Sequence, residues 1–123
     1  MVLVDTSVWV DHLQRGNPEL AALLNRGRVL VHPFVIGELA LGSLQQRTRI
    51  LDALQNLPTV TQATDTEVQG FISAHTLYGI GIGYVDAHLL AATRLTPAAQ
   101  LWTLDKRLQA AADGLGMAFT LNY

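Results

Sequence analysis

The sequence predicts a single α/β domain over residues 1–123, in which helices cover both faces of a central, mostly parallel sheet. Two observations predict this fold class. Short apolar runs alternate along the whole chain with segments of helical spacing. Half of the 123 residues are apolar, which is enough to form one buried core. Because parallel strands are joined by helical crossovers that pack on either face of the sheet, the alternation indicates three layers.

In the first half of the chain, strand and helix signals follow one another closely. Residues 1–4 form an apolar run that leads into Asp5, Thr6 and Ser7, residue types that cap helices. Helical spacing then predicts two helices, separated by a break at residues 16–18. A brief β-branched strand is expected over residues 28–32, followed by an apolar helix over residues 33–44 that begins with a proline.

The second half continues the alternation. Thr64 or Asp65 opens a long helix, and a glycine-rich loop at residues 79–83 joins it to the next helix. The loop does not have the spacing of a phosphate-binding loop, and it follows a helix instead of a strand. The expected elements are helices over residues 47–56, 65–78, 84–95 and 105–113, and strands at residues 58–61, 100–104 and 117–120.

Composition excludes several classes of protein. Cysteine is absent, which removes disulfides, thiol catalysis and cysteine zinc sites, and suits a reducing compartment. No apolar run has the length of a membrane helix, and no basic stretch precedes an apolar one at the N-terminus. We therefore expect a cytoplasmic protein with no membrane association. The net charge of −2 argues against a protein that holds nucleic acid by charge alone.

Four of the ten acidic residues have surroundings that a solvated surface role does not fully explain. Glu38 lies in an apolar helix, so we expect it to be buried and to need a cation, a proton or a metal, with an ordinary salt bridge or surface position as the alternative. Asp5 and Asp105 each end a strand and begin a helix, and helix capping explains them equally well. Asp86 lies in a first helical turn, where the helix dipole also favours a carboxylate.

The combination of these acids is more informative than any one of them. Two aspartates end strands at the same edge of a parallel sheet, and the other two acids lie on adjoining helices, so all four can face one pocket. Such a cluster is tenable only if protons or divalent cations neutralise it. All-oxygen ligands select Mg²⁺ or Mn²⁺, and sites of this kind polarise phosphoryl oxygens and activate water. The four acids therefore favour phosphodiester hydrolysis.

The motifs around these acids resemble those of PIN domains, and in particular of the VapC toxins of bacterial and archaeal toxin–antitoxin pairs. VLVDTSVWVD at residues 2–11 is similar to the family's opening strand and Asp-Thr-Ser turn. The segments similar to those that carry the second, third and fourth acids of the family are FVIGELALG at residues 34–42, YVDAHLLAATRL at residues 84–95 and LWTLDKRL at residues 101–108. In this order the four motifs are together specific, and they cover essentially the whole chain.

The resemblance implies a three-layer α/β/α PIN-like fold and a Mg²⁺- or Mn²⁺-dependent endoribonuclease that acts on tRNA or ribosomal RNA. The metal-binding and catalytic residues it implies are Asp5, Glu38, Asp86 and Asp105, supported by Thr6, Ser7 and Thr103. It also implies a VapB-like antitoxin as partner, contact with operator DNA only through that antitoxin, and a homodimer. Lys106 and Arg107 are candidates for RNA phosphate contacts, although a solvated helix face explains them as well.

Three alternative functions remain open. A receiver domain of a signalling protein shares the architecture and an acidic Mg²⁺ pocket, but it needs an acidic pair after the first strand, where this chain has only Asp5. A PIN-fold protein-binding module without catalysis has no need of all four acids. A DNA-directed nuclease of related fold usually carries extra acids and inserted helices. Phe34 and the two tryptophans are expected in the core rather than in any of these sites.

Overall fold

The computed structural model describes residues 1–121, which form an α/β fold of three strands and seven helices. The strands are β1 (Val2–Val4), β2 (Val29–Leu30) and β3 (Gln100–Trp102). The helices are α1 (Thr6–Arg15), α2 (Pro18–Asn25), α3 (Pro33–Ala40), α4 (Arg47–Gln55), α5 (Asp65–Ala74), α6 (Tyr84–Leu95) and α7 (Lys106–Gly114). None of the described helices combines the length and the apolar character needed to cross a bilayer.

The three strands form one parallel sheet in the order β2-β1-β3, so the first strand of the chain is central. Val2 pairs with Val29 of β2, and Val4 pairs with Trp102 of β3. The backbone N–H of Asp5 donates to the carbonyl oxygen of Trp102 at 2.9 Å, so the pairing of β1 with β3 continues one residue beyond both strands. The carboxyl ends of these two strands therefore lie side by side.

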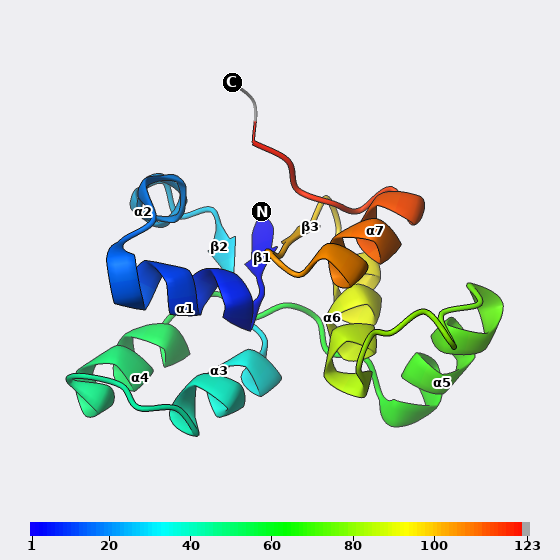
Figure 1. Cartoon of the computed structure of the whole chain (residues 1–123), viewed down its shortest axis with the longest axis horizontal. Helices are drawn as coiled ribbons and strands as arrows, with labels where there is room; N and C mark the ends of the chain where they lie inside the picture. Colours follow the sequence, from blue (N-terminus) through cyan, green and yellow to red (C-terminus); the bar gives the residue numbers. More distant parts are fainter. Residues whose placement is uncertain (122–123) are drawn as a thin grey trace.

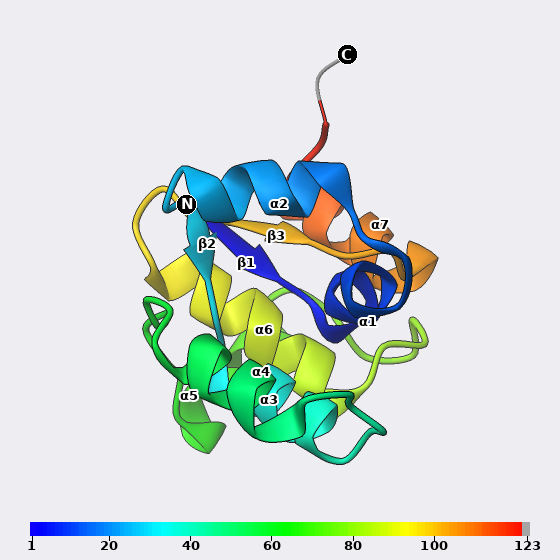
Figure 2. The ribbon, with the colours of Figure 1, turned by 90° about the vertical axis from the view of Figure 1, so that its left-hand side faces the viewer.

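Helices cover both faces of the sheet, which confirms the predicted three-layer architecture. In Figure 1, α1 and α2 lie on one side of the strands, and α6 and α7 lie on the other. Figure 2 shows the strands between α2 and α6. The remaining helices extend these layers, since α3 packs against α1 and α4, and α5 packs against α6.

The sheet and α6 form the centre of the hydrophobic core. All three residues of β1 are buried, and Leu3 is fully inaccessible to solvent. In α6 every residue from Ala87 to Thr93 is buried, so this helix contacts the core around its whole circumference. Asp86 immediately precedes this buried stretch, so its backbone is anchored to the core through α6.

Two strands that the sequence predicted are reduced to single bridges in the described part of the chain. Val31 bridges to Thr59 beyond one edge of the sheet, and Leu101 bridges to Ala118 beyond the other. Pro58 has no backbone N–H to continue a ladder, which limits the first of these segments. The predicted strands at residues 58–61 and 117–120 were therefore wrong as strands, although both segments contact the sheet.

Two helices also end earlier than predicted. α3 ends at Ala40 instead of residue 44, and α5 ends at Ala74 instead of residue 78. Thr76 adopts a left-handed backbone conformation with φ of 54°, which does not continue a helix. The prediction that Phe34 lies in the core was wrong, because its side chain is 40% exposed in the first turn of α3 and packs against the ring of His88.

Truncating the central strand should destabilise the fold. We expect Leu3→Ala to lower the free energy of unfolding by about 2–5 kcal/mol, because it leaves a cavity between the sheet and its helices. Leu41→Ala is the matched control, since Leu41 is 91% exposed and the change should cost less than about 0.5 kcal/mol. Urea unfolding followed by circular dichroism measures both values. Equal losses for the two variants would show that the side chain of Leu3 does not contribute to the core.

Candidate active site

Asp5 is a buried carboxylate at the carboxyl end of β1, with only 6% of its surface exposed. Its Oδ2 accepts hydrogen bonds from the hydroxyls of Ser7 at 2.7 Å and Thr103 at 2.8 Å. Ser7 Oγ in turn accepts the backbone N–H of Leu104, and Thr103 Oγ1 accepts that of Asp105. These two N–H groups donate to side-chain hydroxyls and not to a neighbouring strand, which explains why β3 ends two residues earlier than predicted.

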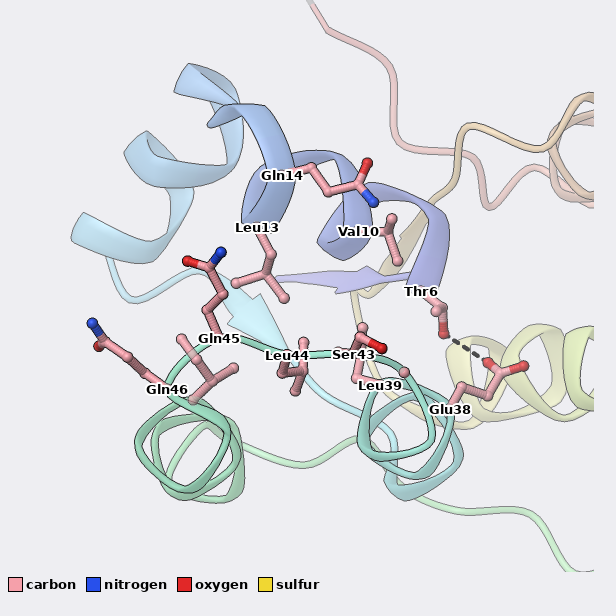
Figure 3. Close-up of a pocket in the computed structure, with 12 residues that line it drawn as sticks. Thr6, Val10, Leu13, Gln14, Glu38, Leu39, Ser43, Leu44, Gln45 and Gln46 are labelled. Carbon is pink, nitrogen blue, oxygen red and sulfur yellow. Dashed lines mark hydrogen bonds between the residues drawn. The ribbon is translucent and has the colours of Figure 1, made fainter.

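Glu38 projects from α3 towards the first turn of α1. The hydroxyl of Thr6 donates to Oε1 of Glu38 at 2.6 Å, a contact drawn in Figure 3. The prediction that Glu38 is buried was wrong, because the residue is exposed. Val35 and Leu39 form the buried face of α3, and that face is too narrow to include Glu38.

Asp86 and Asp105 both stand at helix N-termini, and each takes the structural role that its sequence position allows. Asp105 is the N-cap of α7, and its Oδ1 accepts the N–H groups of the second and third helical residues at 3.0 and 2.9 Å. Oδ2 of Asp86 accepts the N–H of Gly83 at 3.0 Å, just before α6 begins. Asp5 also precedes a helix, but its side chain makes no capping hydrogen bond, so capping does not account for that residue.

In all four carboxylates the protein's hydrogen bonds fall on a single oxygen. The oxygens that accept them are Oδ2 of Asp5, Oε1 of Glu38, Oδ2 of Asp86 and Oδ1 of Asp105. Within residues 1–121, the second oxygen of each carboxylate accepts no hydrogen bond from the protein. One oxygen of each acid therefore fixes the side chain, and the other stays available to a ligand.

The four acids, which we call the acid cluster, share one electrostatic environment. Partial burial is the main cause that raises the pKa of Asp86 above 3.8, and the hydrogen bond from Gly83 opposes this rise. The pKa of Asp86 is raised further by the negative charges of Asp5, Asp105 and Glu38. A pKa raised by neighbouring carboxylates indicates a place where a cation is favoured.

The donor chemistry of the acid cluster suits a hard divalent cation. The oxygens of the cluster that accept no hydrogen bond from the protein are all carboxylate oxygens, the ligands that Mg²⁺ and Mn²⁺ prefer. In the side-chain arrangement seen in residues 1–121, however, no three acidic or histidine side chains converge closely enough to bind one ion. Binding by three or more protein ligands therefore requires side-chain rotation, whereas Mg²⁺ commonly keeps several waters and needs only one or two carboxylates.

The other residues that the sequence predicted lie around these acids. Thr6 contacts Glu38, while Ser7 and Thr103 contact Asp5. Lys106 and Arg107 are exposed in the first turn of α7, directly after Asp105.

The structure contains a pocket of about 600 Å³ beside Glu38 that the sequence did not predict. It opens between α1 and the connection from α3 to α4, and Thr6 and Glu38 form the end that adjoins the acid cluster (Figure 3). Polar side chains such as those of Gln14, Ser43 and Gln45 line it as well. These residues come from separate segments with no shared periodicity, so no signal in the sequence could have identified the pocket.

Comparison with known proteins gives consistent matches over most of the chain. The model of the PIN domain family matches residues 2–114. Ribonuclease VapC32 of Mycobacterium tuberculosis, from strains CDC 1551 and H37Rv, is 47% identical over 118 residues, which cover 96% of this chain and 95% of that protein. The crystal structure of FitAcB from Neisseria gonorrhoeae has a similar fold, with a TM-score of 0.62 and 19% identity over 92% of this chain and 94% of that one.

The charge of Asp86 should lower stability near neutral pH when no divalent cation is present. A pKa that is higher in the folded state means that ionised Asp86 is less favourable there than in the unfolded chain, and this penalty develops as pH rises above 3.8 and through the raised pKa. Asp86→Asn removes the charge and keeps an acceptor for the N–H of Gly83. We therefore expect the variant to be more stable than the wild type at about pH 7 in EDTA, with the difference vanishing at about pH 3.

Urea unfolding at both pH values measures this difference. Asp113→Asn, a change at an exposed acid in α7, is the control and should leave stability unchanged. If the Asp86 variant were less stable than the wild type near neutral pH, ionised Asp86 would carry no penalty in the folded state and its pKa would not be raised.

Proposed function

The chain belongs to the PIN-domain family and, within it, to the VapC ribonucleases, and on this premise we propose that it is the toxin of a toxin–antitoxin pair, an endoribonuclease that hydrolyses RNA at the acid cluster. The match extends over almost the full length of both the chain and its relatives, so it includes the segments that carry all four acids. The observation that best supports the location of the site is the pKa of Asp86, which partial burial raises most and which the charges of Asp5, Asp105 and Glu38 raise further.

We propose that the acids of the cluster hold Mg²⁺ or Mn²⁺ through their unbonded oxygens. A bound divalent ion supplies two kinds of chemistry at such a site, since it lowers the pKa of a coordinated water and neutralises charge on the phosphoryl oxygens. The proposal draws its support from the donor chemistry and from the unfavourable charge that four neighbouring carboxylates create.

The protein's own contribution is to fix the carboxylates before RNA binds. The hydroxyls of Ser7 and Thr103 hold one oxygen of Asp5, so its other oxygen has a defined direction. Thr6 holds Glu38 in the same way. Residues that orient a metal ligand act through that ligand, and their loss commonly costs about 10- to 100-fold in activity or metal affinity.

The proposed partner is a VapB-like antitoxin that neutralises the nuclease and through which alone operator DNA is bound. A homodimer, and tRNA or ribosomal RNA as the substrate, remain predictions from the family resemblance. A cytoplasmic location remains a prediction from composition. Lys106 and Arg107 remain candidates for contacts with RNA phosphates, because both are exposed next to Asp105.

The function is tested by incubating the protein, freed of any partner, with total tRNA and ribosomal RNA in Mg²⁺, Mn²⁺ or EDTA. We expect discrete fragments with either metal and none in EDTA. Asp5→Asn should lower the cleavage rate by more than about 100-fold, and Thr103→Val by about 10- to 100-fold, because Thr103 orients Asp5 and the backbone of Asp105 but is not itself a proposed metal ligand. Gel electrophoresis of end-labelled RNA measures the rates.

Asp113→Asn is the matched control, because it removes a carboxylate from an exposed position of α7 outside the acid cluster. It should cleave at the wild-type rate. Cleavage by Asp5→Asn at that rate would refute the assignment of the site, and intact RNA under every condition would favour a non-catalytic binding module.

A further inference from the structure

Arg107 packs directly against the backbone of Gly81, in the loop that precedes α6. Gly81 has a φ of +85°, and a Cβ atom built on it would lie 2.5 Å from Nη1 and 2.8 Å from Cδ of Arg107. Real Cβ atoms essentially never approach other atoms so closely. The arginine side chain therefore occupies the space that any residue other than glycine would fill at position 81.

This contact joins the two segments that carry Asp86 and Asp105. On one side, the backbone N–H of Arg107 donates to Oδ1 of Asp105 at the start of α7. On the other side, Gly83, two residues after Gly81, donates its N–H to Asp86 at the start of α6. The arginine thus lies between the N-termini of two helices, next to half of the acid cluster.

The guanidinium of Arg107 is free to bind an anion. It is exposed, and within residues 1–121 it makes no ion pair and no side-chain hydrogen bond. Arg15 and Arg94, in contrast, are engaged by an aspartate and by a backbone carbonyl. An unpaired guanidinium presents several N–H donors in a plane, an arrangement that matches the oxygens of a phosphate.

We propose that Gly81 is a positioning residue for substrate binding: its missing side chain seats Arg107 at the edge of the acid cluster, and from that seat the guanidinium contacts a phosphate of the bound RNA. The proposal rests on the proposed function, since it takes RNA as the ligand. It goes beyond that function by assigning a role to a glycine in a loop and by giving Arg107 a fixed position.

The loop offers a matched pair of glycines for the test. Gly79 and Gly81 both have positive φ, of +72° and +85°, so alanine meets a similar backbone penalty at either position. A Cβ at Gly79 has nothing within 4 Å, whereas a Cβ at Gly81 meets Arg107. Because the atoms it meets belong to the far end of a flexible side chain, Gly81→Ala should displace the arginine without unfolding the loop.

The experiment measures binding of fluorescently labelled bulk tRNA to Asp5→Asn protein, which should not cleave it, as a function of KCl concentration. The salt slope is the slope of the logarithm of RNA affinity against the logarithm of KCl concentration. Arg107→Ala should lower its magnitude by about one, so between about 50 and 200 mM KCl the affinity of this variant should fall by a factor about four times smaller than that of the parent protein. Gly81→Ala should reproduce this slope, and Gly79→Ala should retain the parental slope. The double variant Arg107→Ala/Gly81→Ala should bind as Arg107→Ala does, because the arginine that Gly81 positions is absent.

The proposal is overturned if Gly81→Ala has the same slope as Gly79→Ala, or if Arg107→Ala leaves the slope unchanged. The melting temperatures of Gly79→Ala and Gly81→Ala are measured as well. If they are equal, a lower slope in Gly81→Ala does not come from unfolding, because a purely structural role of Gly81 would lower the melting temperature and leave the slope unchanged. Wild-type cleavage of RNA with unaltered slopes would reject this inference alone. If the Asp5→Asn protein binds no RNA and the wild type cleaves none, the proposed function fails as well.

Discussion

The acid cluster depends on the parallel pairing of β1 with β3. This pairing brings the hydroxyl of Thr103 to Asp5, although the two residues are separated by 98 positions in the chain. It also places Asp105, which follows β3, at the edge of the sheet where Asp5 ends β1. The positions of Asp5 and Asp105 therefore follow from the register of two short strands, whereas α3 and α6 place Glu38 and Asp86.

The sequence predicted those parts of the site that depend on chain order. Asp5 and Asp105 each follow a strand, and a parallel sheet must bring such positions together. The exposure of Glu38 was not predictable from its apolar neighbours, because the pattern shows that α3 has a buried face but does not show how wide that face is. The contact of Arg107 with Gly81 was hidden for another reason, since only tertiary packing places the loop before α6 against α7.

Stability and ligand binding compete within the cluster. Partial burial and, after it, repulsion by the neighbouring acids raise the pKa of Asp86, which means that ionised Asp86 costs folding free energy when no cation is present. Part of this cost is offset locally. Asp86 and Asp105 stand at the N-termini of α6 and α7, where the helix dipole favours negative charge and where their hydrogen bonds satisfy backbone N–H groups. The same carboxylates therefore stabilise the helices that present them.

The long separation between Asp5 and Thr103 also matters while the protein is being made. A chain emerges from the ribosome with its N-terminus first, so Asp5 and β1 emerge long before β3, the strand that pairs with β1. Until the segment with Thr103 and Asp105 has emerged, β1 lacks one side of its sheet and the buried carboxylate lacks one of its two hydroxyl donors. The acid cluster can therefore be assembled only after the segment with Thr103 and Asp105 has been synthesised.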